Sequence, residues 1–240
     1  MNIIKTKKLN NLQYYPVFSK KEQIFLHHTG GLSAQSAIDW WNQTPEHVGT
    51  SFIIDRDGTI YEVFPRENWA YHLGIKNDDN LLEKSSIGIE LVAAGPLYKE
   101  NDGKFYFYPI YPSKLIKKVI NPEDIWELKE GWRGSKYYHK YTDAQITSLI
   151  ELIKELIQEF GIEVQKDIKD FHIYNEIIYS QHLKGIWSHS SVRQDKNDIV
   201  PHQDLIDKLS TLLPIEQSTQ MVSNQVKPFT RLESIKNRRK

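Results

Sequence analysis

The chain has 240 residues, which is enough for one good-sized domain or two small ones, and its 39% hydrophobic and 26% charged residues are usual for a folded protein. Its 31 basic and 31 acidic residues give a net charge of zero, which argues against a dedicated nucleic-acid binder. The absence of cysteine excludes disulfides, thiolate nucleophiles and thiolate metal ligands, so any metal site must use His, Asp and Glu.

The N-terminus carries basic residues at Lys5, Lys7 and Lys8, but no apolar stretch or small-residue cleavage site follows them. A secretory signal peptide is therefore not expected. No apolar run in the chain approaches the roughly 20 residues that cross a bilayer. We expect a protein that is made in the cytoplasm and is not inserted in a membrane.

The first elements have clear signals. Residues 23–27 form a short apolar run that predicts a buried strand ending at His27. Ser33 is a good N-cap for a helix that follows it. Residues 51–55 and 59–64 predict the two strands of a hairpin, because the turn between them contains Asp-Gly.

The middle of the chain alternates regular and irregular stretches. Residues 86–92 predict a central strand. Residues 95–140 are rich in Tyr, Lys, Pro and Gly, and we interpret them as a long insertion on the rim of the core. Thr142 then begins the clearest amphipathic helix, whose apolar positions follow the i, i+3, i+4, i+7 pattern until Gly161 ends it.

The last third begins with a second irregular stretch at residues 166–184, followed by the apolar residues 185–187 and then His189. A final helix is predicted over 202–213. From residue 214 onward the composition is basic, which predicts a solvated, flexible tail or a tether for anionic cell-wall polymers. The element order predicts an α/β fold in one domain over 1–213, with a central mixed β-sheet flanked by helices and long loop insertions.

Two histidines, His27 and His189, stand at the ends of predicted strands, where backbone pairing fixes the direction of a side chain. Asp198 follows nine residues after His189. Two imidazoles and one carboxylate leave a tetrahedral zinc ion one open position for water, as hydrolytic zinc sites require. Each residue alone is also consistent with a structural role, and it is the joint pattern that points to a metal site.

Two further residues suit the chemistry of hydrolysis. Glu90 lies in the middle of a predicted central strand, where an unpaired carboxylate is costly unless it faces a reacting water. Lys196 lies two residues before Asp198, and its ammonium group would stabilise an oxyanion. A carboxylate in a strand usually faces solvent and a Lys-x-Asp pair is usually surface, so both alternatives stay open.

The order of these motifs resembles type-2 N-acetylmuramoyl-L-alanine amidases, a superfamily that includes phage lysozyme-type amidases and peptidoglycan recognition proteins. The resemblance covers about residues 22 to 213. The segments that carry it are Phe25-Leu-His27-His28-Thr29-Gly30, Ser51-Phe-Ile-Ile-Asp-Arg-Asp-Gly58, Ala70-Tyr71-His72-Leu73-Gly74, Ser86-Ile-Gly-Ile-Glu90-Leu, Tyr141-Thr-Asp-Ala-Gln145 and Ser188-His189-Ser-Ser-Val-Arg-Gln-Asp-Lys196-Asn-Asp198.

The resemblance implies that His27, His189 and Asp198 bind zinc (Zn²⁺) and that Glu90 and Lys196 are catalytic, as in the glutamate-containing members of the family. It also implies cleavage of the amide bond between N-acetylmuramic acid and the L-alanine of the peptidoglycan stem peptide. For His72 the family places a substrate-binding residue at the groove, with a packed surface histidine as the alternative. His28 should point to the opposite face of its strand from His27.

Other functions fit the sequence less well. A peptidoglycan-binding module without activity would lack one of the five catalytic and ligand positions, and all five are filled here. An iron(II) oxygenase of the two-His-one-carboxylate type would need a histidine downstream of Asp204, and none follows. Neither a Gly-x-Ser-x-Gly elbow nor a Gly-rich phosphate loop is present.

Within the amidase interpretation two biological roles are open. We expect a bacteriolytic endolysin, encoded by a phage or prophage, that reaches the cell wall after release by a holin. The alternative is a cytosolic amidase that recycles soluble anhydro-muropeptides. In either case the expected partner is peptidoglycan or its fragments, and the sequence indicates no particular oligomeric state.

Overall fold

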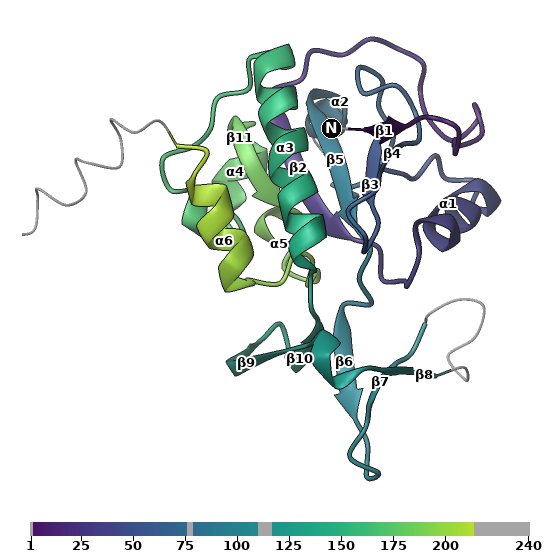
Figure 1. The fold of residues 1–240 in the computed structure, drawn as a ribbon. Coiled ribbons are helices and arrows are strands. Elements are labelled where there is room, and N and C mark those ends of the chain that lie inside the picture. Colours follow the sequence, from purple (N-terminus) through teal and green to yellow (C-terminus); the bar gives the residue numbers. More distant parts are fainter. Residues whose placement is uncertain (1, 76–78, 110–116, 214–240) are drawn as a thin grey trace, which may run out of the picture.

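The computed structural model describes residues 2–75, 79–109 and 117–213. Two sheets organise them (Figure 1). The first has the strand order β1-β4-β3-β5-β2-β11. Its strands are β1 (Ile3–Ile4), β2 (Gln23–His28), β3 (Phe52–Ile54), β4 (Ile60–Glu62), β5 (Ser86–Leu91) and β11 (Gly185–Ser188).

The first sheet is mixed, as the sequence predicts. Strands β3, β5, β2 and β11 run parallel to one another, whereas β4 is antiparallel to β3. All four parallel strands therefore present their carboxyl ends at one edge of the sheet. In the β2–β5 pair His27 lies opposite Glu90.

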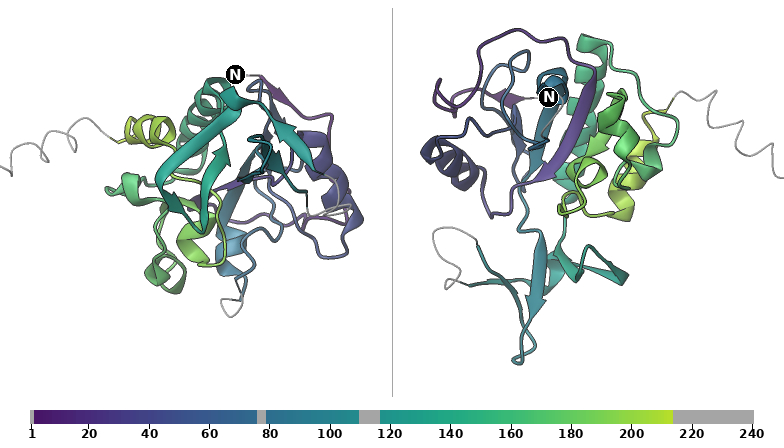
Figure 2. Two further views of the ribbon diagram at one scale, coloured as in Figure 1. Left: turned by 90° about the horizontal axis from the view of Figure 1, so that it is seen from below. Right: turned by 180° about the vertical axis from the view of Figure 1, so that it is seen from behind.

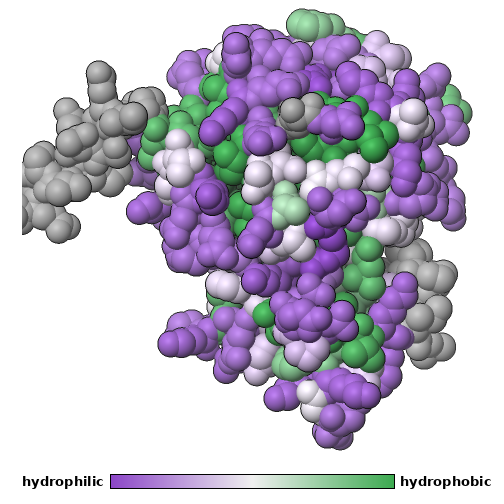
Figure 3. All heavy atoms as spheres, in the orientation of Figure 1, coloured by the Kyte–Doolittle hydropathy of each residue, from purple (hydrophilic) through white to green (hydrophobic). Residues whose placement is uncertain are grey.

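Helices cover both faces of this sheet. On one face lie α3 (Asp143–Phe160) and α6 (Gln203–Ser210), which bury residues such as Leu149, Ile153 and Leu205 against Ile24 and Leu26. Thr142 caps α3 in a capping box, and Gly161 ends it in a left-handed conformation. The outer surface on this side is largely hydrophilic (Figure 3), as expected for helices that bury one stripe.

The opposite face is covered by α1 (Ala34–Gln43), with Ser33 as its N-cap, and by α2 (Leu81–Ser85). The side chains of β2 alternate between the two faces, so Phe25 and His27 share this second face. Two short helices, α4 (Glu176–Ser180) and α5 (His189–Val192), complete the core. Among the described residues, no helix combines the length and the apolar character that a bilayer-spanning segment needs.

The insertion at 95–140 contains regular structure that the sequence interpretation did not predict. It forms a second sheet of order β8-β7-β6-β10-β9. Its strands are β6 (Pro96–Lys99), β7 (Phe105–Phe107), β8 (Lys118–Ile120), β9 (Ile125–Trp132) and β10 (Ser135–His139), with a short 3-10 turn, Pro122–Asp124, before β9.

This second sheet follows β5 directly and lies beyond the carboxyl ends of the core strands (Figures 1 and 2). Its own small core includes Leu97, Phe107 and Ile120. Leu32, from the loop between β2 and α1, packs against these residues. The second insertion at 166–184 holds a 3-10 turn, Ile168–Asp170, and α4. The expected tail at 214–240 lies outside the described residues, so the proposed domain boundary at 213 stays a prediction.

Candidate metal centre and active site

Three neighbouring strands bring the candidate residues together. His27 is the penultimate residue of β2, Glu90 is the penultimate residue of β5, and His189 directly follows β11. Because β11, β2 and β5 are adjacent and parallel, these residues meet at one edge of the sheet. Asp198 comes from the loop that follows α5, and it completes the group.

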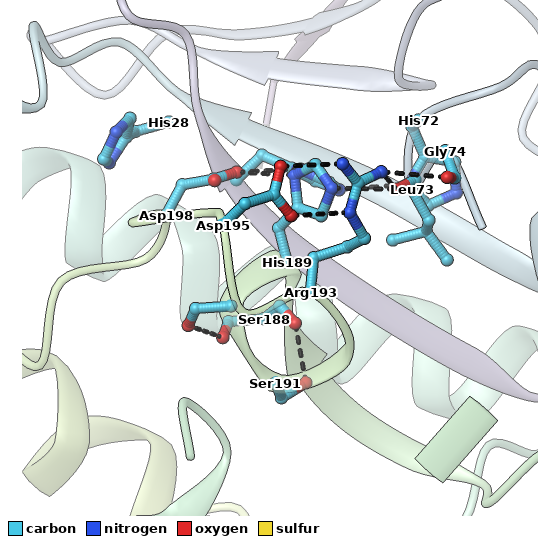
Figure 4. Close-up of polar contacts among 12 residues, drawn as sticks. His28, His72, Leu73, Gly74, Ser188, His189, Ser191, Arg193, Asp195 and Asp198 are labelled. Carbon is cyan, nitrogen blue, oxygen red and sulfur yellow. Dashed lines mark hydrogen bonds and ion pairs between the residues drawn. The ribbon is translucent and has the colours of Figure 1, made fainter. Parts of the chain in front are cut away.

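The two histidines and the aspartate form a compact cluster, of which Figure 4 labels His189 and Asp198. Nδ1 of His27 and Nδ1 of His189 each lie 3.1 Å from the same oxygen, Oδ2 of Asp198. One ligand atom from each residue lies within 4.8 Å of the others, and all three residues are buried. Two imidazole nitrogens and a carboxylate oxygen that converge in this way fit a divalent ion such as zinc.

The opposite nitrogens of the two rings are already engaged. Nε2 of His189 donates to the carbonyl oxygen of Leu73 at 3.0 Å. Because a carbonyl only accepts, the proton is on Nε2 and does not need to be on Nδ1. Nε2 of His27 lies 3.0 Å from Nδ1 of His72, whose own Nε2 lies 2.8 Å from Oγ of Ser86. Partners of this kind orient metal-binding histidines.

Burial and neighbouring charges set the protonation of His27 and Asp198. Burial lowers the pKa of the His27 imidazole to about 4, against the opposing pull of Asp198. Burial alone would raise the pKa of Asp198, but His189 and His27 hold it well below its usual value. His27 therefore offers a neutral imidazole and Asp198 an ionised carboxylate near neutral pH, the forms that bind metal ions.

Glu90 lies beside this cluster in an environment that is unusual for a carboxylate. Its oxygen Oε2 is buried and has no hydrogen-bond partner within the described part of the chain. Burial raises the pKa of Glu90 well above its usual value, and the negative charge of Asp198 adds to the rise. A buried, unpartnered carboxyl group next to a candidate metal site suits a proton-transferring residue.

Lys196 and His72 differ in how they lie relative to the cluster. Lys196 is half-buried on the loop that carries Asp198, and its ammonium group makes no hydrogen bond with the side chains of His27, His189, Asp198 or Glu90. The side chain of His72 is only 5% exposed and packs behind His27. This placement favours a role in holding His27, and a direct substrate contact by His72 stays a prediction.

His28 points to the other face of the sheet, as the alternation along β2 predicts. Its Nδ1 lies 3.2 Å from the hydroxyl of Tyr141, a residue of the core beneath α3. The same hydroxyl accepts the backbone N–H of Val200 at 3.3 Å, just after the Asp198 loop. His28 therefore follows His27 in sequence but contacts Tyr141 on the opposite face of β2, where the charge of Asp198 still acts on its ring.

Two arginines that the sequence did not single out fix the loop carrying His189 and Asp198. Arg193 donates from Nη1 to the carbonyl oxygens of Leu73 at 3.2 Å and Gly74 at 2.8 Å, and it forms a fork with Asp195 (Figure 4). Arg133, from the turn between β9 and β10, donates to the carbonyl oxygens of Ser190 and Gln194. No local sequence pattern marks these contacts, because both join segments that are distant along the chain.

Comparison with known families decides the identity. A family model described as N-acetylmuramoyl-L-alanine amidase matches residues 18–203, which include every candidate site residue. The chain belongs to this amidase family. The resemblance seen in the sequence is thereby confirmed, and the enzyme is an N-acetylmuramoyl-L-alanine amidase. A comparison with curated proteins found no match.

Solved structures of similar fold include several amidases. The N-acetylmuramyl-L-alanine amidase AmiD from E. coli, in complex with an anhydromuramyl tripeptide substrate, is 18% identical, with a TM-score of 0.50 over 91% of this chain and 68% of that one. PlyL is 15% identical (TM-score 0.49; 87% and 97% covered). A mutant endolysin from Bacillus subtilis is 16% identical (TM-score 0.48; 88% and 97% covered). At 18% identity the likeness to AmiD shows the α/β fold alone.

Proposed function

We propose that the amidase is zinc-dependent and that His27, His189 and Asp198 hold the ion. The main observation that supports this is that Nδ1 of His27 and Nδ1 of His189 each lie 3.1 Å from the same Asp198 oxygen. The Nε2 atoms of the two rings contact other groups, so the Nδ1 atoms are left to face the ion. Bound there, the ion would polarise the scissile carbonyl and acidify a water molecule. Because cysteine is absent, imidazole nitrogens and carboxylate oxygens are the donors expected at such a site.

In this proposal Glu90 moves the proton. The carboxylate accepts a proton from the attacking water and then delivers it to the departing alanine nitrogen. Its burial and its unpartnered Oε2 support this role, because a carboxyl group with a raised pKa holds a proton readily. A divalent cation nearby would favour the ionised form that accepts the proton.

Lys196 is proposed to stabilise the oxyanion of the tetrahedral intermediate. Its position two residues before Asp198 keeps its flexible side chain on the same loop as a metal ligand. The ammonium group is not committed to an interaction with the other four residues, so it is free to meet a negative charge that develops on the substrate.

The proposed substrate bond is the amide between the lactyl group of N-acetylmuramic acid and the first L-alanine of the stem peptide. The decisive experiment combines metal analysis of the purified protein with mass spectrometry of digested muropeptides. We expect about one zinc ion per chain and release of intact stem peptides with a free L-alanine amine. Cleavage at another bond, or full activity after complete zinc removal, would contradict the proposal.

The endolysin role expected from the sequence stays a prediction, and substrate choice tests it. An endolysin should act on intact sacculi at least as well as on soluble fragments, whereas a recycling enzyme should prefer anhydro-muropeptides. A pure binding module would retain sacculi and release no stem peptide even when it is loaded with zinc. Rates measured on both substrates with the same enzyme preparation separate these three outcomes.

A further inference from the structure

A second buried carboxylate, Glu83 of α2, lies outside the mechanism described above. Its side chain is 0% exposed. Oε1 accepts the backbone N–H groups of Leu73 (3.1 Å) and Gly74 (2.8 Å), and Oε2 accepts those of His72 (2.8 Å) and Leu73 (3.1 Å). Three consecutive backbone donors are thus held by one side chain.

The ionised form of Glu83 is the one that these contacts suit. Burial raises the pKa of Glu83, and the three N–H groups oppose that rise. Because both oxygens already accept hydrogen bonds, a proton on either oxygen would displace a backbone donor. Hydrogen bonds to an ionised carboxylate are about twice as strong as those between neutral groups.

Two of the three residues that Glu83 holds, His72 and Leu73, contact the candidate zinc ligands. The carbonyl oxygen of Leu73 accepts from Nε2 of His189 at 3.0 Å, and the ring of His72 meets Nε2 of His27 at 3.0 Å. Both histidines are therefore supported from one short loop. The loop's position depends on the carboxylate beneath it.

Glu83 and His189 are linked through a single peptide group, that between Leu73 and Gly74. The N–H of Gly74 and the carbonyl of Leu73 belong to the same peptide unit, so Glu83 and His189 bind its two ends. A carboxylate that accepts the N–H polarises the peptide and makes its carbonyl a stronger acceptor. A stronger bond at Nε2 makes Nδ1 of His189 a better metal donor.

We propose that Glu83 is a positioning residue for the metal centre, which it supports through the 72–74 loop. The proposal rests on the proposed zinc site and adds a residue that touches neither the ion nor the substrate. By this arrangement the carboxylate sets the orientation of both histidines and strengthens the hydrogen bond that Leu73 accepts from His189.

The test substitutes Glu83→Gln in the full chain, which keeps the size of the side chain but turns one acceptor oxygen into a donor facing backbone N–H groups. We expect zinc to bind about 10- to 100-fold more weakly, as measured by competition with a chromophoric chelator. Glu62→Gln is the matched control, because Glu62 is also buried and bonded, to Arg66, but does not contact the 72–74 loop. An equal loss in both variants, or none in Glu83→Gln, would overturn the proposal.

A measurement on the metal-free protein keeps this inference separate from the zinc proposal. In NMR spectra the backbone amide of Gly74 and the Nε2–H of His189 should exchange slowly with solvent in the wild type, and Glu83→Gln should accelerate both. If the wild type binds no zinc, the proposed function fails while this measurement still decides the role of Glu83. Should the variant not fold, rapid exchange at both groups in the wild type would be enough to refute the proposal.

Discussion

The ring of His202 offers a sharp test of how burial controls stability. Its side chain is 0% exposed, and within the described residues neither ring nitrogen has a hydrogen-bond partner. The ring packs against the indole of Trp126 with a centroid distance of 3.9 Å. His202→Phe keeps an aromatic ring of similar size in this place and removes two buried polar atoms that make no hydrogen bond.

The size of the effect follows from the pKa. Burial lowers the pKa of His202 from 6.5 to about 4 in the folded protein, against the opposing charge of Asp204. Above pH 6.5 the residue is neutral in both states and contributes no pH dependence. As the pH falls from 6.5 to about 4, only the unfolded chain binds the proton, so the folded state loses stability. The loss is about 2 kcal/mol at pH ~5 and about 3 kcal/mol once the pH is below both values.

The assay is urea unfolding of the metal-free wild type and of His202→Phe, at about pH 7.5 and about pH 5. Other buried histidines titrate in both proteins, so their contributions cancel in the difference between the two. We expect His202→Phe to gain about 2 kcal/mol relative to the wild type on acidification. If the difference in unfolding free energy were the same at both pH values, the assigned environment of His202 would be wrong.

Three further predictions concern the site and the scaffold. Asp198→Ala should lose stoichiometric zinc as well as turnover, since it removes the oxygen shared by both histidines; full zinc content by metal analysis would refute its role as a ligand. Glu90→Gln and Lys196→Ala should keep zinc and lose on the order of 10²–10⁴-fold and 10²–10³-fold in rate, and a wild-type rate would remove either residue from the mechanism. Lys21→Met should lower the free energy of unfolding in urea by about 2–4 kcal/mol, because the buried Lys21 ammonium donates to three backbone carbonyls that would be left unpaired. Lys20→Met is the control: Lys20 is exposed, so its substitution should be nearly neutral.

Much of the core was predictable because its signals are local. The strand over 23–27, the hairpin at 51–64 and the helix that begins at Thr142 are confirmed within a residue or two. Each depends on a periodicity or a cap that adjacent residues define. The second sheet was missed because four of its five strands have only three to five residues, and because the strands pair across an insertion whose packing no local pattern reveals.

The candidate site, too, was predictable only in part from the sequence. The types and order of His27, Glu90, His189 and Asp198 are visible in the sequence, and motif order was enough to identify the family. Their convergence could only be inferred, because it requires β11, β2 and β5 to be parallel neighbours. The burial of His72 behind His27 was not anticipated, since a motif position does not tell which way a ring points.

The sequence alone determined which metal-ligand donors are present, namely nitrogen and oxygen but no cysteine sulfur. It also determined the amidase motif order and most of the core strands and helices that carry the motifs. The tertiary structure decided which atoms meet. A hydrogen bond reaches only about 3 Å. The bond from His189 to the carbonyl oxygen of Leu73, 116 residues away in sequence, therefore forms only once the chain has folded.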